Sequence, residues 1–479
     1  MRRTKIICTL GPASDKIETL KQMVEAGMNV ARLNFSHGTH AYHKKLMTNV
    51  RKVAKSLDKT IAIMQDLQGP KIRVGNMPKR GVDIKTDATV VITTKKVKQG
   101  SSKLIPVDYP LLHKDISVGD HIMMVDGLLD FEVHKIIDKD IHCKVINGGK
   151  LFSDKGINLP GVALSIAALT DKDKEDLEFG IQNNVDFVAL SFVSEAGDVH
   201  DLRYLIKDIE KKLKIKNKRP IKIIVKIERQ DAVKNFDEIL DATDAVMVAR
   251  GDLGVEIPSE EVPIKQKEII DKCLDAAKPV IVATQMLDSM IRNPRPTRAE
   301  TSDVANAVID HADAVMLSGE TATGDYPVKT VETMAKIVER TENSTYDDLV
   351  LKDKVKKIES TDKAIGKVAK MLVDNIDAKA IVVASLSGFT ARIVSRYRPE
   401  LPILVSCDDE RVRRQMILSW GVQPFLISTC KSVEELVART ISDIKGDKLV
   451  KKGDKIILVA GEPVGASGNV NFVEIKEVN

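Results

Sequence analysis

Residues 221–252 read IKIIVKIERQDAVKNFDEILDATDAVMVARGD. This stretch begins and ends with a short apolar run, Ile221–Glu228 and Ala245–Asp252, and each run passes directly into charged residues. Runs of this length with little alternation are typical of parallel strands covered on both faces. The other runs of this kind are Lys5–Thr9, Val30–Asn34, Ile61–Asp66, Phe187–Phe192, Val280–Thr284 and Ala314–Gly319. Helical patterns fill most of the gaps, so we predict an α/β fold built on a (β/α)₈ TIM barrel.

A long insertion separates the apolar run that ends at Asp66 from the run that begins at Phe187. Its middle is rich in turns and contains four segments typical of strands, which are Val90–Thr94, His121–Val125, Phe131–Ile137 and Ile141–Ile146. We therefore predict a small β-barrel domain over residues 70–164, inserted between two parts of the barrel domain, 1–69 and 165–343. Gly69-Pro70 is a suitable hinge. The insertion could be a lid over the barrel mouth or an addition without a functional part.

A new pattern begins after a polar segment, Thr341 to Thr361, which is interpreted as a linker. Strand-like segments alternate again with helical ones, at Ala380–Ala384, Ile403–Ser406, Pro424–Ile427 and Ile456–Ala460. Residues 344–479 are thus predicted to form a separate, doubly wound α/β domain.

Local signals predict several helix ends. Asp15 and Glu18 have the spacing of a capping box at the start of a helix Asp15–Ala26, and Gly27 is the expected stop. Two more helices are predicted at Glu260–Ala276 and Thr301–Ile309.

Composition narrows the class of protein. The chain has 479 residues, a formal net charge of +5 and 4% aromatic residues, which argues against a nucleic-acid partner. None of the five cysteines forms a C-x-x-C pair, so a reducing compartment fits. Neither a signal peptide nor a membrane-spanning apolar run is visible, and we expect a cytoplasmic protein without a membrane partner.

Charged and hydroxyl residues follow the predicted strands, where a barrel of this type forms its active site. Glu228 and Asp252 end adjacent strands and could share Mg²⁺, which binds few carboxylates and keeps open positions. Lys226 lies two residues before Glu228, so both side chains face the same way. Taken singly, Lys226–Glu228 could also be a structural ion pair and Asp252 a helix cap. Arg32 suits a phosphate or a carboxylate, although it could equally be a salt-bridge partner.

These residues belong to longer blocks that resemble the pyruvate kinase family over nearly the whole chain. The blocks are residues 3–14, 34–38, 156–161, 226–228, 247–258, 283–324 and 395–399. The resemblance implies a Mg²⁺-dependent enzyme that transfers the phosphoryl group of phosphoenolpyruvate to ADP, giving pyruvate and ATP in the last step of glycolysis. It also implies a homotetramer, and Mn²⁺ as an alternative metal.

The resemblance further implies a role for each matching residue. The catalytic residues would be Lys226, Thr284, Arg32 and Arg73. Phosphoenolpyruvate would be bound by Arg32, Lys226, Gly251, Asp252 and Thr284. The nucleotide would be bound by Arg73, Lys155, Asn34, His37, Pro12 and Tyr42. The metal would be bound by Glu228 and Asp252.

One block departs from the family pattern. Many members carry Thr and Glu where this chain has Leu67 and Lys71, and those members require K⁺. The remaining residues of that cation site are Asn34, Ser36 and Asp66. A K⁺ about 4 Å from the Lys71 ammonium would be opposed by roughly 4 kcal/mol. We therefore predict that this ammonium replaces K⁺ and that K⁺ is not required.

The C-terminal domain carries allosteric sites in many relatives. A polar loop before a predicted helix could hold a phosphorylated effector through Ser385, Ser387, Gly388 and Thr390. Gly461–Gly468 could close over it. Two alternative functions stay open. A metal-dependent lyase or mutase of phosphoenolpyruvate or pyruvate would not need ADP, and a non-catalytic binding protein would not need Lys226.

Overall fold

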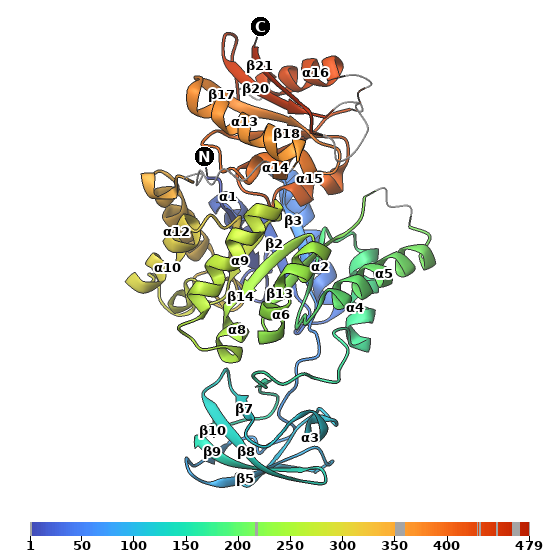
Figure 1. Ribbon diagram of the computed structural model, residues 1–479, viewed down its shortest axis with the longest axis vertical. Coiled ribbons are helices and arrows are strands. Elements are labelled where there is room, and N and C mark those ends of the chain that lie inside the picture. Colours follow the sequence, from blue (N-terminus) through green and yellow to red (C-terminus); the bar gives the residue numbers. More distant parts are fainter. Residues whose placement is uncertain are drawn as a thin grey trace.

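The computed structural model describes residues 2–215, 219–349, 360–428, 430, 433–446, 449–461 and 470–478. Three bodies follow one another along the long axis of the molecule (Figure 1). The barrel occupies the middle, the inserted domain lies beyond one end of it, and the C-terminal domain packs on the other end.

Eight parallel strands form the closed barrel, in the order β1-β16-β15-β14-β13-β12-β3-β2. Their bounds are β1 Lys5–Thr9, β2 Val30–Asn34, β3 Ala62–Asp66, β12 Phe187–Leu190, β13 Lys222–Ile227, β14 Ala245–Ala249, β15 Val280–Ala283 and β16 Ala314–Leu317. The prediction of a TIM barrel is confirmed. Several strands end one to three residues before the predicted position. The charged residues at those positions begin loops or, at Arg250, a helix.

Helices surround this barrel. They are α1 Ile17–Ala26, α2 His40–Ser56, α4 Asp171–Gln182, α5 Ala196–Lys212, α6 Gln230–Lys234, α7 Phe236–Ala242, α8 Arg250–Glu256, α9 Val262–Ala276, α10 Arg298–Ile309, α11 Gly319–Ala322 and α12 Pro327–Glu342, with short 3₁₀ turns at Asp288–Ile291 and Thr345–Asp347. Successive side chains of a barrel strand point alternately into the barrel and outward against the helices. Ile7 and Met64 belong to the cluster inside the barrel, whereas Ile6 and Ile63 pack against the helices.

The predicted helix ends were partly wrong. Helix α1 begins after Lys16 without a side-chain cap, and Asp15 instead accepts from Lys45 Nζ at 3.0 Å. Gly27 ends α1 as predicted, with a φ of 119° that favours glycine. Helix α10 begins at Arg298, earlier than predicted, because Thr297 and Glu300 form a capping box.

The insertion has its own sheets and its own core. Its elements are β4 Val82–Ile84, β5 Thr89–Thr93, β6 Leu104–Pro106, α3 Leu112–Asp115, β7 His121–Met124, β8 Leu129–Ile137, β9 Asp140–Asn147, β10 Gly149–Leu151 and β11 Ile157–Asn158. Six strands form one sheet in the order β11-β7-β8-β9-β5-β6, and β4 pairs with β10. Phe131, Ile92 and Ile141 are fully buried within it.

The C-terminal domain contains a five-stranded sheet in the order β19-β18-β17-β20-β21. Its elements are α13 Thr361–Asn375, β17 Ala378–Ala384, α14 Phe389–Ser395, β18 Ile403–Cys407, α15 Glu410–Met416, β19 Val422–Leu426, α16 Val433–Gly446, β20 Lys455–Ala460 and β21 Phe472–Glu477. Strand β21 is antiparallel to β20 and was not predicted. Residues 350–359 of the predicted linker and most of the Gly461–Gly468 loop lie outside the described residues.

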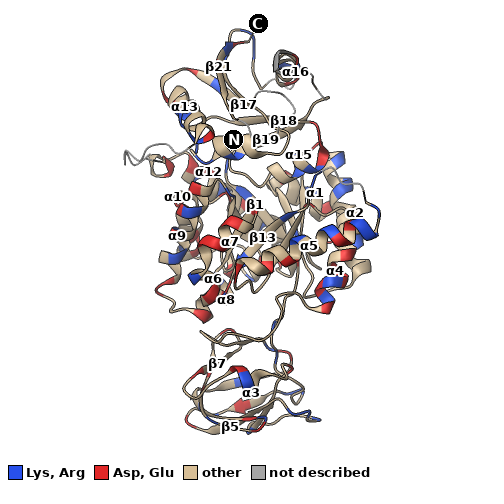
Figure 2. Ribbon diagram, turned by 45° about the vertical axis from the view of Figure 1, so that its right-hand side comes forward, with Lys and Arg blue, Asp and Glu red and all other residues tan. Residues whose placement is uncertain are grey.

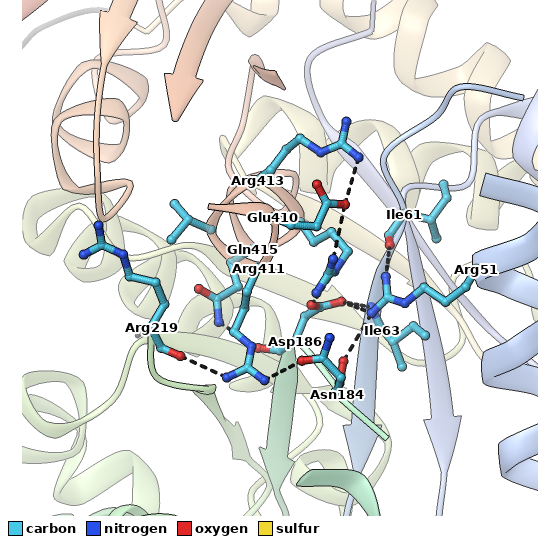
Figure 3. Close-up of polar contacts among 12 residues, drawn as sticks. Arg51, Ile61, Ile63, Asn184, Asp186, Arg219, Glu410, Arg411, Arg413 and Gln415 are labelled. Atoms are coloured by element: carbon cyan, nitrogen blue, oxygen red, sulfur yellow. Dashed lines mark hydrogen bonds and ion pairs between the residues drawn. The ribbon is translucent and has the colours of Figure 1, made fainter. Parts of the chain in front are cut away.

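The C-terminal domain is joined to the barrel by buried ion pairs (Figure 3). Asp186, immediately before β12, is fully buried and accepts from Arg51 Nη2 at 2.8 Å and from Arg414 Nε at 2.7 Å. Asp313, immediately before β16, accepts from Arg398 Nη2 at 3.0 Å and from the Trp420 amide at 2.9 Å. The C-terminal domain therefore covers the N-terminal ends of β12 and β16, on the side of the barrel opposite to the inserted domain (Figure 1).

Figure 2 shows both positive and negative residues on the barrel helices. In the described part of the chain, no helix combines the length and the apolar character needed to cross a membrane.

Candidate active site

Lys226 lies at the centre of the mouth that faces the inserted domain. Its ammonium is 2.7 Å from Glu228 Oε1 and 3.5 Å from Asp66 Oδ1, and it donates to Ser191 Oγ at 2.9 Å. Burial alone would lower the pKa of Lys226, but the charges of Asp66 and Glu228 raise it above its ordinary value. The Lys226 ammonium is therefore held by three oxygen partners that favour its charged form.

Arg32 lies beside this group at the end of β2. Its Nε donates to Asp66 Oδ2 at 2.6 Å and its Nη1 to Thr9 Oγ1 at 2.8 Å. Burial favours a raised pKa for Asp66, yet the charges of Lys226 and Arg32 outweigh it and lower that pKa. Asp66 thus holds both cations in place and brings their two positive charges together.

Glu228 and Asp252 supply the two carboxylates expected for a metal. Glu228 is almost fully buried and accepts from the Phe192 amide at 2.9 Å. Burial raises the pKa of Glu228, and the nearby Asp252 charge adds to that effect. Asp252 is on α8, and its carboxylate is bound by Lys71 Nζ at 2.9 Å. Burial would raise the pKa of Asp252, but Lys71 lowers it below its ordinary value.

This donor set fits Mg²⁺. No group of three or more His, Cys, Asp or Glu side chains suited to a metal occurs among the described residues. Mg²⁺ is commonly held by only one or two carboxylates and completes its shell with water and substrate oxygens. Glu228 and Asp252 would therefore hold it with positions left for a substrate.

Thr284 and Gly251 meet at the next two strand ends. The Gly251 amide donates to Thr284 Oγ1 at 2.8 Å, and the Thr284 hydroxyl donates to the Ala283 carbonyl at 2.6 Å. Thr284 has a φ of 72°, which is unfavourable for a β-branched residue. Arg250 Nη2 donates to the Thr284 carbonyl at 2.8 Å and fixes this conformation. Strained backbone of this kind is common where a side chain must be held for function.

The predicted nucleotide residues are spread along the rim. Arg73 and Lys155 lie on the two strands that join the insertion to the barrel, and Arg73 Nη1 donates to the Asp154 carbonyl at 2.9 Å. Pro12 and His37 are exposed, whereas Tyr42 is only partly exposed. Asn34 Oδ1 accepts from the Ser36 amide at 3.1 Å. A cleft of about 790 Å³ lies between Asp126 of the insertion and the Gly251–Asp252 segment.

Lys71 does not lie where the K⁺ argument places it. Its ammonium contacts Asp252, and no hydrogen bond or ion pair joins it to Asn34, Ser36 or Asp66 in the described part of the chain. The charge of Asp66 is instead met by Arg32 and Lys226. The predicted set of four residues is therefore not assembled in this structure.

Two polar residues of the site were missed from the sequence. Ser191 follows β12 and binds Lys226, but Ser-Phe after a strand carries no distinctive signal. Asn158 of β11 is buried, and its side chain faces both Asp252 and Glu256. It belongs to the block 156–161 that carries the family resemblance, so its position in that block was an available signal.

Of the predicted effector residues, Ser385, Ser387 and Gly388 lie between β17 and α14, and Thr390 lies in the first turn of α14. Gly388 has a φ of 79° and precedes α14, and Ser385 and Thr390 are buried. Ser387 lines a cavity of about 30 Å³ against Lys222 and Asp244 of the barrel. The loop therefore faces the domain junction as well as the sheet.

Comparisons with known proteins agree with this geometry. The family model for the pyruvate kinase barrel domain matches residues 1–331, and that for the pyruvate kinase alpha/beta domain matches residues 363–476. The pyruvate kinases of Sporosarcina psychrophila and Geobacillus stearothermophilus are each 45% identical to this chain, and the matches cover 100% of it and 81% of each relative. A solved pyruvate kinase of Cryptosporidium parvum has a TM-score of 0.92 and 38% identity, and the match covers 100% of this chain and 96% of that one. The chain belongs to the pyruvate kinase family.

Proposed function

We propose that this protein transfers the phosphoryl group of phosphoenolpyruvate to ADP and so produces pyruvate and ATP. The observation that carries the proposal is the fixed Lys226 ammonium between Asp66 and Glu228, next to the Arg32 guanidinium. Phosphoryl transfer needs charge neutralisation and positioning more than a covalent nucleophile, and this mouth offers both. The family match and the names of the relatives support the same reaction.

Different residues of the site would bind the phosphoryl group and the carboxylate of phosphoenolpyruvate. Arg32 and Lys226 would bind the phosphoryl group, and Lys226 would also stabilise the enolate oxygen left after transfer. The Gly251–Asp252 backbone at the start of α8 and the Thr284 hydroxyl would bind the carboxylate. Glu228 and Asp252 would hold Mg²⁺, or Mn²⁺ in its place, and the bound metal would neutralise substrate oxygens. Arg73 and Lys155 would reach the nucleotide phosphates, with Asn34, His37, Pro12 and Tyr42 around them.

We also propose where the enzyme acts, how it assembles and what binds its C-terminal domain. It would act in the cytoplasm as a homotetramer, and a phosphorylated effector would bind the loop of Ser385, Ser387, Gly388 and Thr390.

The direct experiment follows pyruvate formation from phosphoenolpyruvate and ADP, with Mg²⁺ present or removed by a chelator. We expect turnover only when ADP and a divalent metal are both present. Consumption of phosphoenolpyruvate without ADP would favour the lyase or mutase alternative. A folded protein without any turnover would contradict the proposal.

The same assay tests the need for K⁺. We expect activity without K⁺ and NH₄⁺, with ionic strength held by tetramethylammonium, because the Lys71 ammonium can leave Asp252 once a metal is bound. We expect Lys71→Glu to become K⁺-dependent, because it restores the carboxylate that K⁺-requiring members of the family carry at this position. Loss of wild-type activity on omitting K⁺ would overturn the proposal that the enzyme does not require K⁺.

Thr284 is expected to act in protonation of the enolate. Replacing Thr284 by Ala should slow exchange of the pyruvate methyl protons with deuterated water by about 10²-fold, because the hydroxyl that positions the proton donor is removed. Thr284→Ser is the matched control, since it keeps the hydroxyl and should stay within a few-fold of wild type. Exchange is measured by proton NMR with ATP and Mg²⁺ present. Equal rates in the two variants would exclude a role for the hydroxyl.

A further inference from the structure

Both strands that join the insertion to the barrel converge on Asp252. On the outgoing strand, Lys71 Nζ is 2.9 Å from Asp252 Oδ1. On the return strand, the buried Asn158 side chain faces the same carboxylate. Asp252, a predicted metal ligand on the barrel, therefore also holds the hinge of the insertion.

Lys71 is confined in this position rather than free on the surface. Its Cε lies so close to Gly156 that a Cβ on that glycine would be 2.6 Å away. Its ammonium lies 5.8 Å from the centre of the Phe192 ring, and the Phe192 amide donates to Glu228. The side chain therefore runs from the outgoing segment past Gly156 of the return segment to the Asp252 carboxylate.

The barrel elements that carry these carboxylates also hold the return strand directly. Arg229, next to Glu228, donates from Nη2 to the Val162 carbonyl at 2.9 Å. Glu256, at the end of α8, faces the Asn158 side chain and the Leu159 amide. The elements that carry Glu228 and Asp252 are therefore joined to the return segment by side-chain contacts of their own.

We infer that Asp252 latches the hinge through Lys71 while no metal is bound, and that a divalent cation displaces the Lys71 ammonium from it. The inference rests on the metal site of the proposed function. Mg²⁺ sits at about 2.1 Å from its ligand oxygens, and an ammonium on the same carboxylate would be strongly repelled by the dication. Metal binding would thus release the outgoing hinge strand before a substrate arrives, and metal and Lys71 would compete for one carboxylate.

The competition is tested by Mn²⁺ binding without substrates, followed by electron paramagnetic resonance of the free ion. Removing the ammonium with Lys71→Met should tighten Mn²⁺ binding by about three- to fivefold, the upper end expected for loss of one partly exposed ion pair. Lys267→Met is the matched control. Lys267 lines the same cleft but binds Asp310 instead of Asp252, so its loss should change affinity less than about twofold. Equal affinities for the two variants would overturn the inference.

The release of the hinge is tested by hydrogen exchange of the backbone amides of residues 71–74 and 156–159. In the wild type, Mg²⁺ should speed exchange in these segments. In Lys71→Met, exchange should already be fast without metal, and Mg²⁺ should add little. Unchanged exchange in the metal-loaded wild type would contradict the latch. Neither measurement needs turnover. A protein that is inactive, but in which Lys71 and Mn²⁺ compete for Asp252, would contradict the proposed function and still support the latch.

Discussion

Replacing Lys226 by Met is expected to lower kcat by about 10³-fold or more, while the protein stays folded. Lys226 carries the only charge that contacts both Glu228 and Asp66 at the mouth in the described structure, at 2.7 and 3.5 Å. Methionine fills a similar volume but offers no donor to a transferring phosphoryl group or an enolate. Without the ammonium, Glu228 and Asp66 would also repel the anionic substrate. The measurement is steady-state turnover at saturating phosphoenolpyruvate, ADP and Mg²⁺.

The matched control is Lys222→Met on the same strand. Lys222 is bound to Asp244 at 2.8 Å, at the covered end of β13. Its removal deletes an equivalent lysine–aspartate contact far from the mouth, so stability should fall while kcat stays within a few-fold. Circular dichroism of both variants checks the fold. A Lys226→Met enzyme with kcat within tenfold of the wild type would show that Lys226 is only a structural partner of the carboxylates.

Replacing Asp186 by Asn should lower the free energy of unfolding by about 3 kcal/mol, because the change removes the buried counter-charge of the buried Arg414 guanidinium and leaves it only the partly exposed Glu410. Asp186 accepts from Arg51, from Arg414 and from the Ile63 amide at 2.8 Å. It therefore joins two barrel strands and the C-terminal domain at one point. Urea unfolding followed by the fluorescence of the single tryptophan, Trp420, reports on this junction, since Trp420 is buried there.

Glu410→Gln provides the comparison within the same group (Figure 3). Glu410 contacts Arg413 at 2.9 Å and Arg414 at 3.2 Å, but its side chain is 44% exposed. Its loss should cost less than about 1 kcal/mol, because exposed pairs are screened by water. If the two substitutions cost the same, the burial of Asp186 would not be what stabilises the junction.

Features that depend on neighbours in the chain were accessible from the sequence. The alternation of residues along a strand places Lys226 and Glu228 on one side, and the structure joins them at 2.7 Å. The same reasoning located all eight barrel strands. Helix ends were less accessible. The Asp15–Glu18 spacing matched a cap, but Asp15 binds Lys45 of the next helix instead.

Features that depend on distant segments were not accessible. Asp186 could have been any polar residue of a turn, because its partner Arg414 comes from another domain. The contact between Lys71 and Asp252 needs the path of both hinge strands, which no local pattern contains. The sequence argument instead grouped Lys71 with Asn34, Ser36 and Asp66, because Lys71 replaces the Glu that favours K⁺ at that site in many members of the family.

The closed barrel has a consequence for how the chain is made. Strand β1 pairs with both β2 and β16. The edge of β1 that pairs with β16, where Lys5 lies opposite Ala314, therefore stays open until β16 has been synthesised. Likewise β3 cannot meet β12 until the whole inserted domain has left the ribosome. The insertion has its own core and can fold first, during synthesis, while the barrel strands beside it still have open edges. Pairings this distant fold slowly, so the nascent barrel depends on chaperones or dilution to keep those edges from joining other chains.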